Sequence, residues 1–329
     1  MKKRSLGKTG VEISEVGLGC WQLGGADWGD VSEDLALEIL NAAAEAGVTF
    51  FDAADVYGDG RSEEMIGKFL KGRASGEALF VATKLGRSAD LYPDKYTEAG
   101  VRAAIEASLR RLGVDVLDLI QLHCVPEEVL RQGDVFEWLR ALQDEGKVRH
   151  FGASVETIDE AHICLAQPGL ASLQIIFNIF RQRAIEELFP AVRENGVGII
   201  VRLPLASGLL SGKFTKDTTF GARDHRTYNR DGQAFNVGET FAGLPFEKGV
   251  EFADEMKAFV PTGLSMVQMA QRWILDRDEV SVVIPGARTI AQVRENASVS
   301  DLPLLPDPLH ERLANYYRSE VQPHIRGRY

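Results

Sequence analysis

Four polar residues with complementary chemistry stand at the ends of three successive apolar segments of the chain. Asp52 ends one segment, with Tyr57 five residues later. Lys84 ends the next segment and His123 the third. A carboxylate, a phenol, an ammonium group and an imidazole together suit proton transfer to a carbonyl oxygen, coupled to delivery of a hydride. The pattern therefore predicts that these four residues are catalytic.

Their expected roles follow from charge and hydrogen bonding. Tyr57 would protonate the substrate oxygen, and the cation of Lys84 would lower the pKa of that phenol from its ordinary value of roughly 10. Asp52 would keep Lys84 charged and oriented. His123 would donate a hydrogen bond to the same oxygen as negative charge develops there. Each residue alone has an ordinary structural interpretation, such as a helix cap or core packing, but their joint placement favours catalysis.

The elements that must position these residues alternate along the 329-residue chain. Short apolar runs rich in β-branched residues predict strands, and the longer stretches between them have helical spacing. Ser32 and Thr97 stand where helix N-caps are expected, and Gly47 where a helix should end. The eight predicted strands span residues 16–19, 48–52, 79–84, 117–123, 150–154, 173–178, 198–205 and 280–285.

Eight strands that alternate with helices predict a parallel sheet, and eight strands close a barrel that side chains can fill. We therefore expect an α/β fold, a single (β/α)8 TIM barrel that forms one domain over residues 1–329. A doubly wound open sheet is the alternative, but no Gly-x-Gly-x-x-Gly follows the first predicted strand. Barrel active sites lie at the carboxyl ends of the strands, where the four polar residues stand.

Two segments fall outside this alternation. Residues 4–14 alternate around two glycines, which predicts an N-terminal hairpin able to plug one end of the barrel. Residues 214–246 follow the seventh predicted strand and are rich in Gly, Asp, Asn and Arg. Loops of this length are more often functional than incidental, so we expect this one to border the site.

Composition narrows the classes of function. The formal net charge of −11 disfavours binding to nucleic acids or membrane surfaces, because both need clustered Lys and Arg. Cys20, Cys124 and Cys164 are far apart and odd in number, which predicts reduced thiols and no metal site. No apolar run has the length of a signal peptide or membrane span, so a cytoplasmic location is expected. The implied partner is a small carbonyl or alcohol substrate, and the oligomeric state is left open.

The sequence resembles the aldo-keto reductase family from the N-terminal hairpin to about residue 300. The resemblance is carried, in family order, by FDAADVYG, VATKLG, LIQLH, KVRHFGASVE, PLASGLLSGKF and VIPGARTIAQVREN. The catalytic tetrad of the family maps onto Asp52, Tyr57, Lys84 and His123. The resemblance also implies an NADP(H) cofactor that lies extended across the barrel mouth, without a separate dinucleotide-binding domain.

The resemblance implies further contacts with the cofactor. Gly19, Cys20 and Trp21 would lie near the nicotinamide. Ser154 and Gln174 would hold its carboxamide. The other implied cofactor positions are Asp52 and Arg202 at the mouth, Leu205, Ser207, Gly208, Leu210, Ser211 and Lys213 around the pyrophosphate, and Gly286, Ala287, Arg288, Gln292, Glu295 and Asn296 at the adenosine end. The residues expected to contact the substrate are Trp21, Trp28, Tyr57 and His123.

Two positions depart from the family pattern. Many members carry an aromatic residue, stacked on the nicotinamide, where this chain has Arg202. A guanidinium group can also stack or bind an anion, so we expect Arg202 either to cover the cofactor or to bind an acidic substrate group. Gln292 stands where some NADPH-specific members have arginine. Arg288 is the expected contact for the 2′-phosphate of NADPH.

The predicted function is the reversible, NADPH-dependent reduction of aldehydes and ketones to alcohols. The nicotinamide would carry the hydride and Tyr57 the proton. One alternative is an NADP(H)-binding regulatory subunit of the same fold, which would bind the cofactor without turnover. Another is a barrel lyase or isomerase that uses Lys84 as a Schiff base, which would need no nicotinamide.

Overall fold

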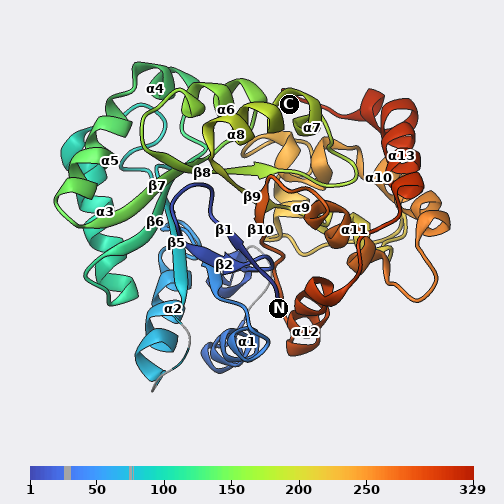
Figure 1. Ribbon diagram of the computed structural model, residues 1–329, viewed down its shortest axis with the longest axis horizontal. Helices are drawn as coiled ribbons and strands as arrows, with labels where there is room; N and C mark the ends of the chain where they lie inside the picture. Colours follow the sequence, from blue (N-terminus) through green and yellow to red (C-terminus); the bar gives the residue numbers. More distant parts are fainter. Residues whose placement is uncertain (26–30, 74–75, 77) are drawn as a thin grey trace.

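The computed structural model describes residues 1–25, 31–73, 76 and 78–329, and it confirms the predicted barrel of alternating strands and helices (Figure 1). Neighbouring strands pair in parallel from β3 to β10. Isolated bridges join Val16 to Val283 and Gly19 to Gly286, which closes the ring. The barrel strands are β3 (Leu18–Gly19), β4 (Phe50–Asp52), β5 (Phe80–Leu85), β6 (Leu117–His123), β7 (Val148–Ser154), β8 (Leu170–Ile176), β9 (Gly198–Arg202) and β10 (Val280–Val283).

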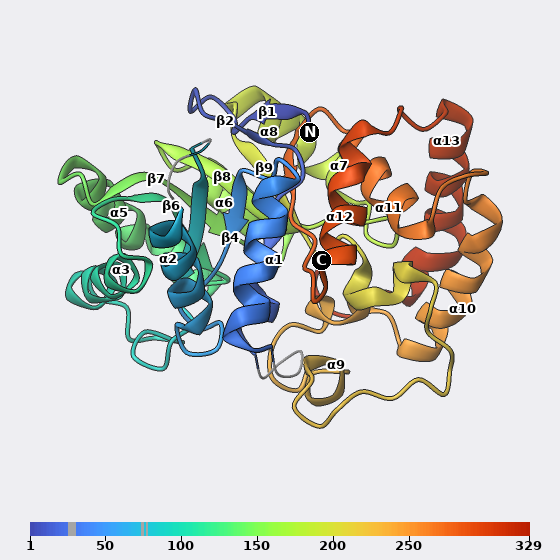
Figure 2. The ribbon, with the colours of Figure 1, turned by 90° about the horizontal axis from the view of Figure 1, so that it is seen from below.

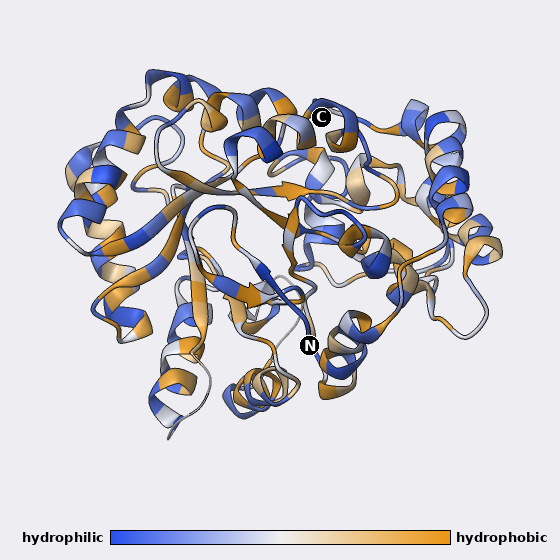
Figure 3. Ribbon diagram, in the orientation of Figure 1, coloured by the Kyte–Doolittle hydropathy of each residue, from blue (hydrophilic) through white to orange (hydrophobic). Residues whose placement is uncertain are grey.

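Helices surround the strands and carry both hydrophilic and hydrophobic residues, whereas the strands are mainly hydrophobic (Figure 3). The expected caps are confirmed, since the side chains of Ser32 and Thr97 accept hydrogen bonds from backbone amides in the first turns of α1 and α3. Within the described part of the chain, no helix combines the length and apolarity needed to cross a membrane. The helices are α1 (Glu33–Glu45), α2 (Arg61–Gly72), α3 (Glu98–Leu112), α4 (Glu127–Gln132), α5 (Asp134–Asp144), α6 (Ile158–Leu165), α7 (Ala184–Glu187), α8 (Phe189–Asn195), α9 (His225–Tyr228), α10 (Phe246–Met256), α11 (Met266–Leu275), α12 (Ile290–Ser298) and α13 (Asp307–Tyr316).

Most strands differ by one to three residues from their predicted bounds, and the early end of β9 has a clear cause in the backbone. The predicted strand 198–205 stops at Arg202. Leu203 has a left-handed backbone conformation with φ of 53°, and Pro204 has no amide hydrogen to continue the pairing. The predicted strand 173–178 is displaced toward the N-terminus, since β8 begins three residues earlier and ends two residues earlier. The carboxyl ends still meet at one edge of the barrel.

The predicted N-terminal hairpin is confirmed and closes the end of the barrel that is opposite Asp52, Lys84 and His123. β1 (Lys3–Ser5) pairs with β2 (Glu12–Ser14) in an antiparallel ladder. Leu6 and Ile13 are fully buried and form a cluster with inward-facing barrel residues such as Phe50. Burial of these side chains removes apolar surface from water, so the hairpin stabilises the closed barrel.

The long segment after β9 contains only short helical turns before α10 begins. Residues 214–246 include α9 and the turns Val237–Glu239 and Phe241–Gly243. Figure 2 shows α9 and its neighbouring chain at the lower edge of the molecule, away from the hairpin. The predicted loop therefore exists, and its position beside the strand ends lets it border the site.

Residues 324–329 pack against this loop. Arg326 Nε donates a hydrogen bond of 3.0 Å to the carbonyl oxygen of Gly243. The ring of Tyr329 lies 4.1 Å from the guanidinium carbon of Arg181, which is buried. A cation held against an aromatic face is stabilised by the charge distribution of the ring. The segment thus ties the loop to residues that follow β8.

Candidate active site

The predicted catalytic residues converge on one cavity of about 660 Å³ at the barrel mouth. Asp52 and His123 are the last residues of β4 and β6, and Lys84 is the penultimate residue of β5. Tyr57 lies on the turn between β4 and α2. Because parallel strands of a barrel all end at the same edge, residues distant in sequence meet there. Asp52, Tyr57 and His123 line the cavity directly.

Lys84 is the centre of a short chain of polar contacts. Its Nζ atom donates to Asp52 Oδ1 at 2.5 Å, to the carbonyl oxygen of Ala53 at 2.8 Å and to Tyr57 Oη at 3.2 Å. The ammonium group has three donors, so every one is used. Burial alone would lower the pKa of Lys84, but Asp52 and Tyr57 carry it above its ordinary value. Lys84 is therefore a charged, fixed neighbour of the phenol.

Asp52 is held by amide groups as well as by the lysine. Its Oδ2 atom accepts from Gln174 Nε2 at 2.8 Å and from Gln121 Nε2 at 3.3 Å. Both glutamines are fully buried. A buried carboxylate needs such partners, because an unpaired charge in the interior is costly. This arrangement fixes the carboxylate that orients Lys84.

Tyr57 is positioned by aromatic neighbours as well as by Lys84. Its ring is stacked on Trp21 with centroids 5.7 Å apart, and His123 meets it edge-on at 5.8 Å. Burial raises the pKa of Tyr57, and Lys84 lowers it; the net shift is upward from the ordinary value. The expected effect of the lysine is present, but burial outweighs it. Tyr57 is consequently a protonated phenol at neutral pH.

His123 is surrounded by cations. Burial lowers its pKa well below the ordinary value, and the charges of Arg87, Lys84 and Arg202 act in the same direction. Its Nδ1 atom has no hydrogen-bond partner among the described residues. A neutral imidazole carries one N–H and can donate it to a substrate oxygen. The geometry therefore agrees with the expected role of His123 as a donor beside the acid.

Most of the positions implied for cofactor binding line the same cavity. Ser154 and Leu210 do not line it: Ser154 is buried beside Cys124, and Leu210 is fully buried. Trp28 lies outside the described residues. The predicted cofactor positions that line the cavity are Gly19, Cys20, Trp21, Asp52, Gln174, Arg202, Leu205, Ser207, Gly208, Ser211, Lys213, Gly286, Ala287, Arg288, Gln292, Glu295 and Asn296.

The cavity wall has features that fit a dinucleotide. Gln174 Oε1 and Gln22 Oε1 are buried without a hydrogen-bond partner among the described residues, so both can accept from a bound ligand. Ser207 and Gly208 have left-handed backbone conformations, with φ of 56° and 101°. Successive amides in such turns form concave sites for anions, which suits a pyrophosphate. At Gly19 a Cβ would lie 2.8 Å from the carbonyl oxygen of Ile284, so only glycine fits there.

Two exposed cations also belong to the cavity lining. They are Lys213 and Arg288, at the rim of the cavity. The side chain of Gln292 folds back, because its Oε1 atom accepts a hydrogen bond of 2.7 Å from the backbone amide of Arg288. The Oε1 atom of Gln292 is thereby engaged by the backbone. The exposed side chains of Lys213 and Arg288 carry the positive charge that suits a phosphate group.

Arg202 lines the cavity, as expected, but its guanidinium group is engaged by the protein. Its NH1 atom lies 2.5 Å from Glu239 Oε2, and its NH2 atom donates to the carbonyl oxygen of Val155 at 3.0 Å. Nε has no partner within the described part of the chain. Because Glu239 balances its charge, the structure favours Arg202 as part of the cavity wall over a binding site for an acidic substrate group.

Arg87, Phe235 and Glu239 are among the cavity residues that were not foreseen from the sequence. The NH2 atom of Arg87 pairs with Glu156 Oε1 at 2.8 Å, and its guanidinium carbon lies 5.5 Å from the ring centre of Phe235. Phe235 and Glu239 belong to the long loop and also line the cavity. Arg87 follows the VATKLG motif directly, so its place after a strand was a usable signal. The loop residues gave no such signal.

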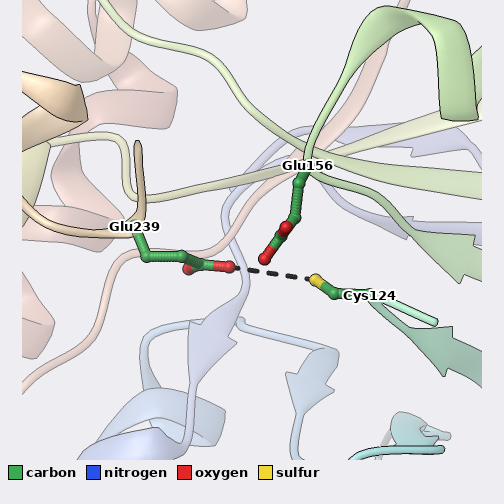
Figure 4. A group of neighbouring side chains, drawn as sticks. All are labelled: Cys124, Glu156 and Glu239. Atoms are coloured by element: carbon green, nitrogen blue, oxygen red, sulfur yellow. Dashed lines mark hydrogen bonds between the residues drawn. The ribbon is translucent and has the colours of Figure 1, made fainter. Parts of the chain in front are cut away.

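Cys124, Glu156 and Glu239 point toward one another beside these arginines (Figure 4). The thiol of Cys124 donates to Glu239 Oε1 at 3.8 Å. Burial raises the pKa of that thiol to about 12, and metals bind the thiolate. Glu156 pairs with Arg87, and Glu239 with Arg202. This group is therefore better described as a charge-balanced network than as a metal site.

The comparison with known families follows from this geometry. The sequence model of the aldo/keto reductase family matches residues 15–316. The chain belongs to the aldo/keto reductase family. Members of this family are oxidoreductases that use nicotinamide cofactors and act on small molecules, so the barrel, its cavity and its polar strand ends belong to an enzyme.

Relatives within the family cover nearly the whole chain. The aldo-keto reductase YhdN of Bacillus subtilis is 30% identical over 305 residues, which cover 91% of this chain and 89% of the relative. The NADH-specific methylglyoxal reductase of Escherichia coli is 29% identical over 322 residues, with coverage of 92% and 95%. The solved holo form of the aldo-keto reductase AKR11C1 from Bacillus halodurans is similar with a TM-score of 0.77 at 27% identity, over 96% of both chains.

Proposed function

We propose that this enzyme catalyses the reversible, NADPH-dependent reduction of aldehydes and ketones to alcohols, with Tyr57 as the proton donor. The observation that carries the proposal is the contact between Lys84 Nζ and Tyr57 Oη at 3.2 Å, with Asp52 on the far side of the lysine at 2.5 Å. A phenol that lines a cavity beside a fixed cation can release its proton to an oxygen on which charge develops.

The steps assigned to the protein use the four strand-end residues. When bound, the nicotinamide supplies the hydride in reduction and accepts it in oxidation. Tyr57 donates its proton to the carbonyl oxygen, and Lys84 stabilises the phenolate that remains. The neutral imidazole of His123 donates a hydrogen bond to the same oxygen, so two donors stabilise the alkoxide as it forms. In oxidation the phenolate removes the alcohol proton.

Cofactor binding is assigned to the residues that fit it. Gln174 would accept from the carboxamide, and the backbone amides around Gly208 would bind the pyrophosphate. Lys213 would also contact the pyrophosphate, and Arg288 would bind the 2′-phosphate, which is the basis for proposing NADPH over NADH. The E. coli relative is described as NADH-specific, so this preference needs a direct comparison of the two cofactors. Three buried, unpaired thiols fit a reducing compartment, and we propose the cytoplasm.

The deciding experiment follows the loss of NADPH absorbance with a panel of aldehydes and ketones, for the wild-type enzyme and for Tyr57→Phe. We expect turnover by the wild type and a loss of about 10²–10⁴-fold in the variant. Tyr316→Phe is the matched control, because that hydroxyl contacts Glu255 on the outside of the barrel. Binding of NADPH without any turnover would favour the regulatory alternative, and failure to bind NADPH would contradict both.

A further inference from the structure

We propose that Glu239 is a positioning residue that balances the charge of Arg202 and Arg87 at the floor of the cavity. In this role it would set the relative affinity of the enzyme for the oxidised and the reduced cofactor. The inference rests on the proposed function, because it assumes that a nicotinamide ring occupies the cavity beside Tyr57 and His123. It concerns a residue of the long loop, whose carboxylate reaches into the cavity beside residues of the strand ends.

The contacts of Glu239 place one carboxylate between two guanidinium groups. Its Oε2 atom lies 2.5 Å from Arg202 NH1, and its Oε1 atom lies 4.0 Å from Arg87 NH1. All three side chains line the cavity, and those of Arg202 and Glu239 are about nine-tenths buried. Charges in such surroundings interact strongly, because little water screens them. Loss of the carboxylate would therefore leave an uncompensated cation at the floor.

The loop backbone holds Glu239 in this position. Ser207 Oγ donates to the carbonyl oxygen of Glu239 at 3.2 Å and accepts from the amide of Phe241 at 3.2 Å. At the preceding residue, Gly238, a Cβ would lie 2.3 Å from NH1 of Arg181, so the backbone packs directly on that buried guanidinium group. These contacts fix the carboxylate against the strand ends. Its location is therefore a property of the folded loop.

A hydride can pass to a carbonyl carbon only if the nicotinamide ring lies next to an oxygen bound by Tyr57 and His123. Asp52, Gln174 and Arg202 line the same cavity as Tyr57 and His123. The charge of Arg202 acts on His123, so a ring in that position would lie near the guanidinium group. The oxidised ring carries a positive charge and the reduced ring does not. An unbalanced Arg202 would therefore repel the oxidised cofactor selectively, and Glu239 prevents this.

The carboxylate of Glu239 also affects the pKa of Tyr57, the proposed proton donor. Its charge raises the pKa of Tyr57, although burial and the neighbouring Lys84 and Asp52 have larger effects. The other charged or titratable groups that face Glu239 among the described residues include Cys124, Arg87, Glu156, Arg181, Arg202 and His123. Removing the charge of Glu239 should lower the pKa of Tyr57, so that the phenolate needed for alcohol oxidation forms at lower pH.

The test is Glu239→Gln, which removes the charge and keeps the shape. Dissociation constants for NADP⁺ and NADPH are measured separately, by quenching of tryptophan fluorescence. We expect the affinity for NADP⁺ to fall on the order of tenfold relative to that for NADPH, as one nearby unit charge predicts. The alkaline rise of the oxidation rate should move to lower pH. Glu247→Gln is the control, because this carboxylate at the start of α10 is exposed and pairs with Arg230.

A second variant separates charge from folding. In Glu239→Gln combined with Arg202→Met, the carboxylate and its cation are both removed, and the ratio of the two affinities should return toward that of the wild type. Equal losses for NADP⁺ and NADPH, or an unchanged ratio in folded Glu239→Gln, would overturn the proposal. If Glu239→Gln does not fold, Arg202→Met alone should shift the ratio toward NADP⁺, and an unshifted ratio would overturn it. A wild-type enzyme that binds neither cofactor would instead contradict the proposed function.

Discussion

Lys84 Nζ and Tyr57 Oη lie 3.2 Å apart although the two residues belong to different strand–helix units of the barrel. On its other side the same ammonium group contacts Asp52 Oδ1. The ammonium group therefore links the carboxylate of Asp52 to the phenol of Tyr57. The cation lies on the buried side of the phenol, which leaves the cavity side of Tyr57 available to a substrate oxygen.

Replacement of the cation tests this link. In Lys84→Met we expect kcat to fall by about 10²–10⁴-fold, because nothing then stabilises the phenolate. Residual alcohol oxidation should also require higher pH, since Lys84 lowers the pKa of Tyr57. Steady-state kinetics between pH 6 and 10 provide the measurement. Lys68→Met, at an exposed lysine that pairs with Glu33, is the control. A kcat within twofold of the wild type would contradict the assigned role.

His123 should make the fold sensitive to acid. Its pKa in the folded state lies well below 6.5, so only the unfolded state binds this proton as the pH falls through that value. The contribution of His123 to the free energy of unfolding is therefore fully present above pH 6.5 and decreases below it, by about 1.4 kcal/mol one pH unit lower. His123→Asn should show a smaller loss of unfolding free energy between pH 7.5 and 5.5 in urea titrations. His324→Asn, at an exposed histidine, should behave as the wild type does.

Asp55 should have the opposite effect on stability. Burial, together with the nearby Glu63, raises its pKa to about 7, above the value of roughly 3.9 in an unfolded chain. Its protonated form is favoured on folding, so it destabilises the protein increasingly from pH 4 to pH 7. We expect the free energy of unfolding of Asp55→Asn to exceed that of the wild type by about 1–3 kcal/mol at pH 8, with little difference at pH 4. Urea titrations at the two pH values provide the measurement. Asp59→Asn on the same turn is the control, and a less stable Asp55→Asn at pH 8 would contradict the argument.

Arg288 should decide the choice of cofactor. Its exposed side chain stands at the cavity rim, where Gln292 is already occupied. We expect Arg288→Ala to raise the dissociation constant of NADPH about tenfold, the loss expected for one charge-assisted hydrogen bond. The constant for NADH should change less than twofold. Arg294→Ala on the exposed face of α12 is the comparison. Equal losses for both cofactors would assign Arg288 to another part of the dinucleotide.

The convergence of the four candidate residues could be predicted because a parallel barrel brings its strand ends together at one edge. A polar residue at the end of β4, β5 or β6 is placed in the mouth by topology, so an error of one residue, as at the end of β5, did not matter. The direction of the net pKa shift of Tyr57 could not be predicted. It depends on how deeply the loops cover the phenol, and this is a property of tertiary packing.

The ion pair between Arg202 and Glu239 in the cavity could not be predicted from the sequence either. Arg202 was expected to face the site, but its partner Glu239 is 37 residues away in a segment without regular structure. Strand and helix periodicity says nothing about side-chain directions in such a segment. Ser154 and Leu210, which the family resemblance places near the cofactor, are buried and do not line the cavity, so their contact with a cofactor stays a prediction.

The packing of residues 324–329 has a consequence for protein engineering. The loop after β9 supplies Phe235 and Glu239 to the cavity, yet it is supported from outside by Arg326 and, through Arg181, by Tyr329. A chimera that imports only the loop of a relative would separate it from these supports. Recombination that aims to change the substrate range of this barrel must therefore exchange three segments together: the loop 214–246, residues 324–329 and the segment after β8 that contains Arg181. These segments are far apart in the gene.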